Sequence, residues 1–179
     1  MSRGFDCDRQ AKYDFTASTA QYWSNTTDPS LLGFYEMTSA GTLVPFGSEE
    51  ADEKSHMDLY IHYSAMTDND LYDVLRYAVE LKERKYYSTA KCITASGAYI
   101  NPEKIESIRQ ETGVTHIWAE LYPDDVIRIW NLSKIDLDSI RFVPSRIKRY
   151  DIYNGPKIPQ KRGLLPVDKA IAIRRVRGQ

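Results

Sequence analysis

Two stretches of alternating side chains constrain this chain most, because alternation places residues i and i+2 on one face of a β-strand. Residues 56–63 (HMDLYIHY) put apolar side chains at every second position and leave Asp58 on the opposite face. Residues 71–84 (LYDVLRYAVELKER) repeat the pattern and leave Glu80 and Lys82 opposite the apolar positions. The alternation therefore predicts two half-buried strands whose polar faces carry two carboxylates and one ammonium group.

The other elements give an α/β chain with the order α-β-β-β-α-β-β. Helices that begin with an N-cap residue followed by proline are typical, and Asp28-Pro29 and Asn101-Pro102 both have this form. Outside the two alternating segments, the sequence predicts helices over 28–41 and 101–113 and strands over 42–46, 115–122 and 125–132. We expect the last two strands to form a hairpin through the Pro123-Asp124 turn.

The length of 179 residues suits one main core, flanked by an extension at each end. Residues 1–27 form an N-terminal extension that can be helical over 9–25, and residues 28–138 form the core. Residues 139–179 form a basic C-terminal extension that we expect to pack on the core. Its prolines and glycines predict irregular structure with one further short strand or helix near 167–175.

Charge is distributed unevenly along the chain. The net charge is −1, but residues 139–179 contain eleven Lys/Arg residues and two acids, a local charge of +9 that leaves −10 for the remainder. Such asymmetry is typical of a segment that faces a polyanion beside an acidic body. The alternative is that the basic segment neutralises the acidic body of the same molecule.

If the two alternating strands pair as an antiparallel hairpin, Asp58, Glu80 and Lys82 converge. Two carboxylates and the backbone carbonyl of Leu81 supply the oxygen ligands that Mg²⁺ prefers, and Mn²⁺ accepts the same donors. A bound Mg²⁺ lowers the pKa of its water and stabilises the charge that develops on a phosphodiester under attack. Lys82 can orient the water or hold the phosphate as a point charge.

Asp on one strand, Glu-x-Lys on the next, then a helix and two strands resemble the PD-(D/E)XK nuclease superfamily. The resemblance covers residues 28–132 and is carried by "MDLYI" and "VELKER". It implies a restriction-endonuclease-like core, with a central mixed sheet of four to five strands flanked by helices. It also implies Mg²⁺-dependent hydrolysis of DNA by an endonuclease or a Holliday-junction-resolvase-like enzyme. The sequence departs from the pattern in the 22 positions from Asp58 to Glu80 and in having Met57 before Asp58.

The resemblance implies further site residues. Glu36 corresponds to an acidic residue that some members carry on their first helix, where it would be an additional metal ligand. Lys104 corresponds to a polar residue near the phosphate. Together with the basic extension, the residues expected to contact DNA are Lys104, Arg146, Lys148, Arg149, Lys161 and Arg162.

Other interpretations of these residues stay open. Glu80 and Lys82 can form a solvated pair, Asp58 can be a strand-edge acid, and Glu36 and Lys104 can be surface residues. His62, on the face of Asp58, can approach the phosphate or simply pack. A catalytically inactive DNA-binding or assembly protein on the same fold is the alternative function, and a plain interaction protein is a third.

We expect DNA as the partner, and a homodimer would suit the cutting of two strands or a four-way junction. The polar N-terminus lacks the apolar core of a signal peptide, and no apolar run reaches membrane-spanning length. The resemblance to bacterial and phage proteins therefore predicts a cytoplasmic protein without a membrane partner.

Overall fold

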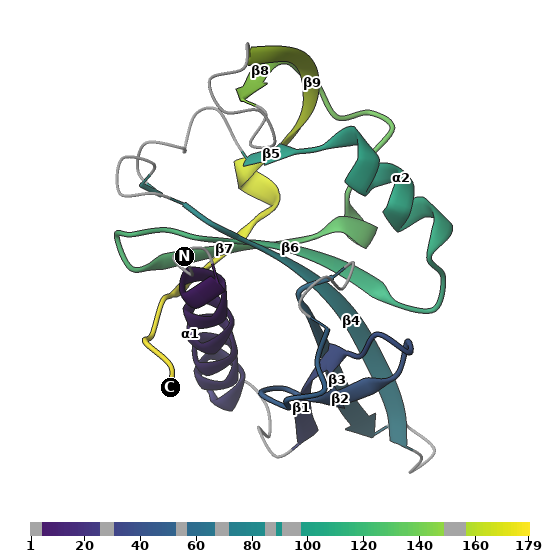
Figure 1. Cartoon of the computed structure of the whole chain (residues 1–179), viewed down its shortest axis with the longest axis vertical. Coiled ribbons are helices and arrows are strands. Elements are labelled where there is room, and N and C mark those ends of the chain that lie inside the picture. The colour runs from purple at the N-terminus through teal and green to yellow at the C-terminus, as the bar shows by residue number, and fades with distance from the viewer. Residues whose placement is uncertain are drawn as a thin grey trace.

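A computed structural model describes residues 5–25, 31–52, 57–66, 72–84, 89–90, 98–148 and 157–179. Within these residues the chain forms a mixed seven-stranded sheet of order β10-β7-β6-β4-β3-β1-β2, with a helix on each face (Figure 1). The strands of this sheet are β1 (Leu32–Met37), β2 (Leu43–Pro45), β3 (Leu59–Met66), β4 (Tyr72–Glu83), β6 (Thr115–Leu121), β7 (Val126–Asn131) and β10 (Ile171–Arg174). The helices are α1 (Phe5–Ser24) and α2 (Pro102–Gln110).

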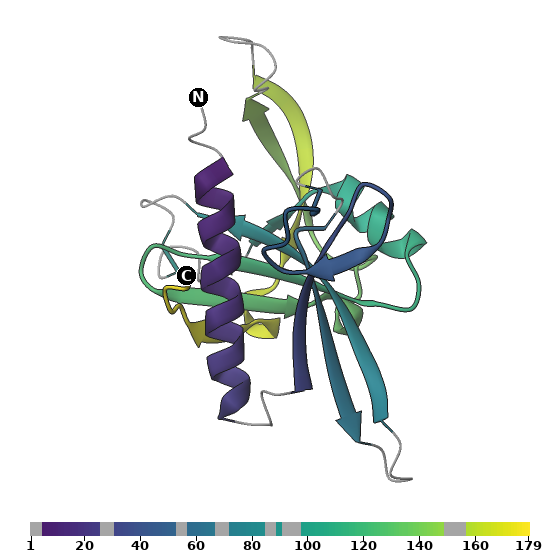
Figure 2. The same cartoon turned by 60° about the horizontal axis from the view of Figure 1, so that its bottom comes forward.

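A smaller sheet of three strands lies on the α2 side of the large sheet (Figure 1). Its order is β5-β9-β8, with β5 (Ala98–Ile100), β8 (Phe142–Lys148) and β9 (Lys157–Leu165). Figure 2 shows the β8–β9 hairpin extending away from the body of the molecule. Two short 3₁₀ helices, η2 (Leu132–Lys134) and η3 (Val167–Lys169), precede β8 and β10.

The central strand, β4, pairs antiparallel with β3 and parallel with β6. The register places Leu59 opposite Val79 on the β3 side, and Glu80 opposite Trp118 on the β6 side. A parallel pair needs a crossover connection, and here β5 and α2 lie between β4 and β6 in the chain. The two alternating segments do pair antiparallel, which is the condition that the sequence set for the convergence of Asp58, Glu80 and Lys82.

Alternation divides the side chains of the sheet between two cores. On the α1 side, Phe15 of the helix belongs to one cluster with Leu59, Val79 and further apolar residues of β6 and β7. On the α2 side, Ile105 of the helix packs in a second cluster with Trp118 and Trp130. Both faces of β4 and β6 are covered, so a polar side chain on either face is buried unless it lies near an end of the sheet.

The α/β class and the mixed sheet with helices on its faces are confirmed, but the predicted count of four to five strands is wrong. Strand β2 at one edge and strand β10 at the other extend the large sheet to seven strands. The predicted irregular structure of residues 139–179 is also wrong, because β8, β9 and β10 occupy most of the described part. The expected element near 167–175 is confirmed as η3 and β10.

The helix predicted over 28–41 is a strand instead. Leu32 and Phe34 pack toward the α1-side core, whereas Tyr35 and Met37 pack in a cluster that includes Tyr60 and Ala78. This alternation and the antiparallel pairing with β3 outweigh local helix signals, since tertiary context overrides propensity in short segments. The proposed helix start, at positions 28–29, lies outside the described residues. The helix expected within residues 9–25 is confirmed as α1.

None of the helices in the described ranges is both long enough and apolar enough to cross a membrane.

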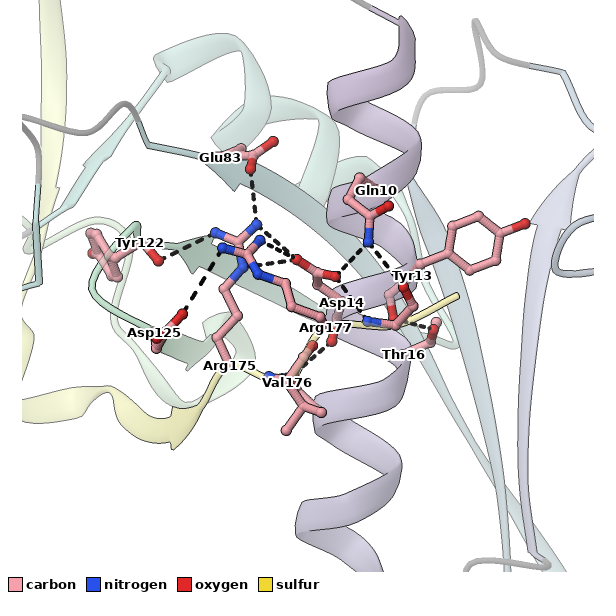
Figure 3. Close-up of polar contacts among 12 residues, drawn as sticks. Gln10, Tyr13, Asp14, Thr16, Glu83, Tyr122, Asp125, Arg175, Val176 and Arg177 are labelled. Atoms are coloured by element: carbon pink, nitrogen blue, oxygen red, sulfur yellow. Dashed lines mark hydrogen bonds and ion pairs between the residues drawn. The ribbon is translucent and has the colours of Figure 1, made fainter.

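The C-terminal segment that follows β10 is fastened to α1 by a buried ion-pair network (Figure 3). Arg175 donates from Nε to Asp14 Oδ2 at 3.0 Å and from Nη2 to Glu83 Oε1 at 2.9 Å. A third bond runs from its Nη1 to the carbonyl of Tyr122 at 3.2 Å. The side chains of Arg175 and Asp14 are 2% and 0% exposed, so a buried guanidinium joins α1 to the end of β4 and to the residue that follows β6.

Hydrogen bonds to Asp14 also hold the last residues of the chain. Burial raises the pKa of Asp14, but bonds from the Gly178 N–H, Gln10, Arg175 and Arg177 outweigh burial and leave the pKa below its ordinary value. At position 178 a Cβ atom would lie 2.1 Å from the Tyr13 carbonyl oxygen, so glycine permits this close approach. Part of the basic C-terminal charge therefore neutralises the acidic body of the same chain.

We expect Arg175→Met to lower the free energy of unfolding by about 3–5 kcal/mol, because it leaves the buried Asp14 carboxylate without its main counter-ion. Urea denaturation at neutral pH measures this loss. Arg177→Met is the matched control: Arg177 also contacts Asp14, but its side chain is 61% exposed, so we expect a loss of about 1 kcal/mol or less. Equal losses in the two variants would contradict this account of the network.

Candidate metal-binding and catalytic site

Asp58 lies at a bend immediately before β3 rather than in the middle of a strand. Its N–H donates to the carbonyl of Val79 at 3.0 Å, although Leu59 is the register partner of Val79. The Asp58 carboxylate then accepts a hydrogen bond at Oδ2 from the Leu81 N–H at 2.7 Å. Asp58 and Leu59 of the β3 side thus both face Val79 of β4, as in a β-bulge. This local irregularity turns the Asp58 carboxylate toward the β4 backbone beside Glu80.

Glu80 is the buried acid of the site, with a side chain that is 8% exposed. Its Oε1 accepts from Lys82 Nζ at 2.7 Å, and its Oε2 accepts from Lys104 Nζ at 2.9 Å. Lys82 is 40% exposed and also lies over the Trp118 ring, with Nζ 5.6 Å from the ring centroid. Helix α2 supplies Lys104, and β4 supplies both Glu80 and Lys82 on its α2 face.

The electrostatics of Asp58 reflect its burial beside a second carboxylate, that of Glu80. Burial raises the pKa of this carboxyl, and the nearby charge of Glu80 raises it further. The Leu81 N–H and the ammonium groups of Lys82 and Lys12 act in the opposite direction but do not cancel these effects. A carboxylate pair of this kind favours an additional cation, because the cation would relieve both the desolvation and the repulsion.

A second buried acid, Glu120, lies next to this group and was not singled out from the sequence. Register places Lys82 opposite Glu120 on β6, and Glu120 opposite Arg128 on β7. The Glu120 carboxylate is fully buried and accepts bonds from Arg84, from Trp118 Nε1 and from the Tyr122 hydroxyl. The sequence feature that could have identified Glu120 is its position within the apolar strand WAELY, where a buried carboxylate needs hydrogen-bond donors.

The aromatic and cationic neighbours of Glu120 complete a polar row across the sheet. Burial, followed by the charge of Glu120, raises the pKa of Tyr122, so its hydroxyl stays a donor to that carboxylate. Arg128 lies over the Tyr122 ring at 5.5 Å and is 9% exposed. Among the described residues its Nη1 has no hydrogen-bond partner. The row therefore contains acids that are already paired, Glu80 and Glu120, and in addition the buried Arg128, whose Nη1 is unpaired within the described residues.

Glu36 and His62 do not join Asp58, Glu80 and Lys82 at the candidate site. Glu36 lies on β1 and is held by Lys12 of α1, at 2.9 Å, and by the Gly47 N–H, at 3.1 Å. Lys12 therefore places the Glu36 carboxylate on the α1 side of the sheet, opposite the face that carries Glu80. His62 packs against the Tyr35 ring at 4.8 Å, four positions beyond Asp58.

Four of the basic residues predicted to contact DNA belong to the β8–β9 hairpin. Arg146 and Lys148 belong to β8, while Lys161 and Arg162 belong to β9. Lys161 is exposed, and Arg162 is half-buried with an Nε that lacks a partner among the described residues. Arg149 lies outside the described residues.

The donor set near Asp58 fits a hard divalent cation in part. It consists of two carboxylates and the Leu81 carbonyl, and Asp58 Oδ1 makes no hydrogen bond within the described ranges. Those ranges contain no group of three or more His, Cys, Asp or Glu side chains arranged for a metal. A magnesium ion here would thus depend on backbone and water oxygens as well as two carboxylates, which is usual for Mg²⁺.

Comparisons with family models, curated proteins and solved structures found no significant match. The likeness to the PD-(D/E)XK superfamily therefore stays a prediction, and it depends on the residues and the geometry described above.

Asp58→Asn should stabilise the metal-free protein increasingly as the pH rises from about 4 to about 8. The folded-state pKa of Asp58 is raised, so its ionisation costs stability once the pH passes the unfolded value, and asparagine removes this cost. Urea denaturation of both proteins at the two pH values, with a chelator present, measures the difference.

The control is the same comparison in a Glu80→Gln background, where one of the two causes of the raised pKa is gone. There the gain from Asp58→Asn should depend less on pH. A stability difference between wild type and Asp58→Asn that is equal at both pH values would refute a raised pKa.

Proposed function

We propose that this protein is a metal-dependent nuclease that hydrolyses DNA phosphodiester bonds. The observation that carries the proposal is the convergence of Asp58, Glu80 and Lys82, with the Asp58 carboxylate bonded to the backbone N–H next to Glu80. A metal held there would supply an activated water and neutralise charge on the scissile phosphate. The element order, from α1 through β1, β3 and β4 to α2 and β6, supports a restriction-endonuclease-like core.

In this proposal each residue has a distinct task. Asp58 and Glu80, with the Leu81 carbonyl, provide the negatively charged and polar oxygens that bind Mg²⁺ or Mn²⁺. Lys82 is the one partly exposed ammonium group beside them on β4, so it can reach a phosphate oxygen or orient a water. Lys104 holds the second oxygen of Glu80 and becomes available to phosphate when the metal neutralises that carboxylate.

The placement of the β8–β9 hairpin supports DNA as the substrate. The hairpin lies on the α2 side of the sheet (Figure 1). Glu80, which is bonded to Lys82 and to Lys104 of α2, faces the same side. Strand β9 presents the exposed Lys161, and its neighbours in the hairpin add further basic positions. Lys and Arg side chains that contact phosphates position the backbone of a nucleic acid without reading its sequence.

One observation favours the alternative of a catalytically inactive DNA-binding or assembly protein. Both oxygens of Glu80 are already bonded to ammonium groups, so Lys82, Glu80 and Lys104 form a fully paired cluster that can be purely structural. In that case the basic hairpin would bind DNA and no bond would be cut.

Incubation with plasmid, single-stranded and branched DNA, with Mg²⁺, Mn²⁺ or a chelator, distinguishes the two functions. We expect metal-dependent cleavage, and we expect Glu80→Gln and Lys82→Ala each to lower its rate about 100-fold or more, the scale of a lost catalytic group. Glu106→Gln and Lys134→Ala are matched controls: both side chains are exposed and lie away from the site.

Salt-sensitive binding of DNA without cleavage, unchanged by Glu80→Gln and Lys82→Ala, would instead establish the inactive DNA-binding protein. Absence of both binding and cleavage at low salt would exclude both functions.

A further inference from the structure

A large cavity lies on the opposite side of the sheet from the candidate metal site. Its volume is about 570 Å³, and it opens between the C-terminal half of α1, the sheet and the two 3₁₀ helices. Its floor includes Ile61, Tyr77 and Ile117, which belong to the α1-side core or pack against it. Cavities of several hundred cubic ångströms lined by apolar side chains are the usual form of small-molecule sites.

The walls of the cavity are mainly aliphatic and aromatic. Helix α1 contributes Phe15, Tyr22 and Trp23, and the opposite wall contains Ile135 and Ile171. Tyr22 and Ile171 are 41% and 52% exposed, although both are large apolar side chains. Exposure of apolar surface around a concave site costs free energy in water, and an apolar molecule that fills the site removes this cost.

Two lysines stand at the rim of this apolar cavity. Lys134, from η2, and Lys169, from η3, are both exposed and line the opening, together with the acid Asp168. The lysine ion pairs of the described residues involve Lys12, Lys82 and Lys104 instead. The rim therefore carries a net positive charge, with two ammonium groups that no carboxylate holds within the described part of the chain.

We propose that this cavity binds a small amphiphilic anion, an apolar aromatic or hydrocarbon body that carries one carboxylate or phosphate. The body fills the space between α1 and the sheet, and the anionic group meets Lys134 and Lys169. Asn131 also lines the cavity, and because its Oδ1 accepts bonds from the Ser133 N–H and hydroxyl, its amide N–H₂ group is the part of the side chain that would donate to the ligand. Apolar enclosure and rim cations together select such a ligand over a neutral one of the same shape.

The site is independent of the proposed nuclease activity. Its floor residues occupy the α1 face of β3, β4, β6 and β7, whereas Glu80 and Lys82 occupy the α2 face of β4. Strand β4 contributes to both sites through alternate residues, Tyr77 to the cavity and Glu80 to the acidic group. Occupancy of the cavity can thus be measured without any assay of DNA cleavage.

Isothermal titration calorimetry with naphthalene-2-carboxylate, naphthalene-2-carboxamide and dodecanoate tests the proposal. We expect at least one of the two carboxylates to bind at concentrations below about 1 mM, and the neutral amide to bind about tenfold more weakly than its carboxylate. The relative affinities of the two carboxylates then distinguish an aromatic from an aliphatic body.

The double variant K134Q/K169Q should weaken carboxylate binding about tenfold and leave amide binding unchanged. Ile171→Glu places a negative charge at the exposed rim and should also weaken the carboxylates, while circular dichroism melting confirms that it folds. Lys161→Gln, on β9, is the matched control and should have no effect. No binding of either carboxylate, or carboxylate binding that is insensitive to both rim variants, would overturn the proposal.

Discussion

The two-sided pairing of β4 is the constraint on which the rest of the structure depends. This strand is antiparallel to β3 and parallel to β6, so it lies inside the sheet, and both of its faces are covered. Its alternate residues therefore have opposite environments: Val79 and Leu81 complete the α1-side core, while Glu80 and Lys82 face α2. A carboxylate fixed in such a position needs partners, and the structure supplies Lys82 and Lys104.

The balance of charge around Asp58 and Glu80 links this packing to the proposed chemistry. Glu80 is paired with two ammonium groups, whereas within the described residues the Asp58 carboxylate accepts a hydrogen bond from a backbone N–H alone, and the charge of Glu80 raises its pKa. A divalent cation would relieve that repulsion and free the lysines for a phosphate group. The buried Glu120, which accepts bonds from Arg84, Trp118 and Tyr122, extends the polar row along the same face.

The sequence predicted best where the hydrophobic period was long and regular. The alternation in 56–63 and 71–84 correctly predicted strands β3 and β4 and the faces of Glu80 and Lys82, because a one-residue slip would expose the core. The prediction of a helix over 28–41 was wrong, because a short apolar run fits helix and strand alike. The predicted face of Met57 was also wrong: Met57 packs with Tyr60, because the chain bends before β3. Neither the Asp14–Arg175 network nor the partners of Glu120 were predictable, since they join residues far apart in the chain.

The most direct test of this account is the location at which a divalent ion binds. Mn²⁺ added to isotope-labelled protein broadens the NMR signals of nearby amides. The account predicts selective broadening at Asp58, Glu80 and Leu81, which the double variant D58N/E80Q abolishes. Broadening confined to other acidic surface residues, or the same broadening in the double variant, would contradict a cation site between β3 and β4.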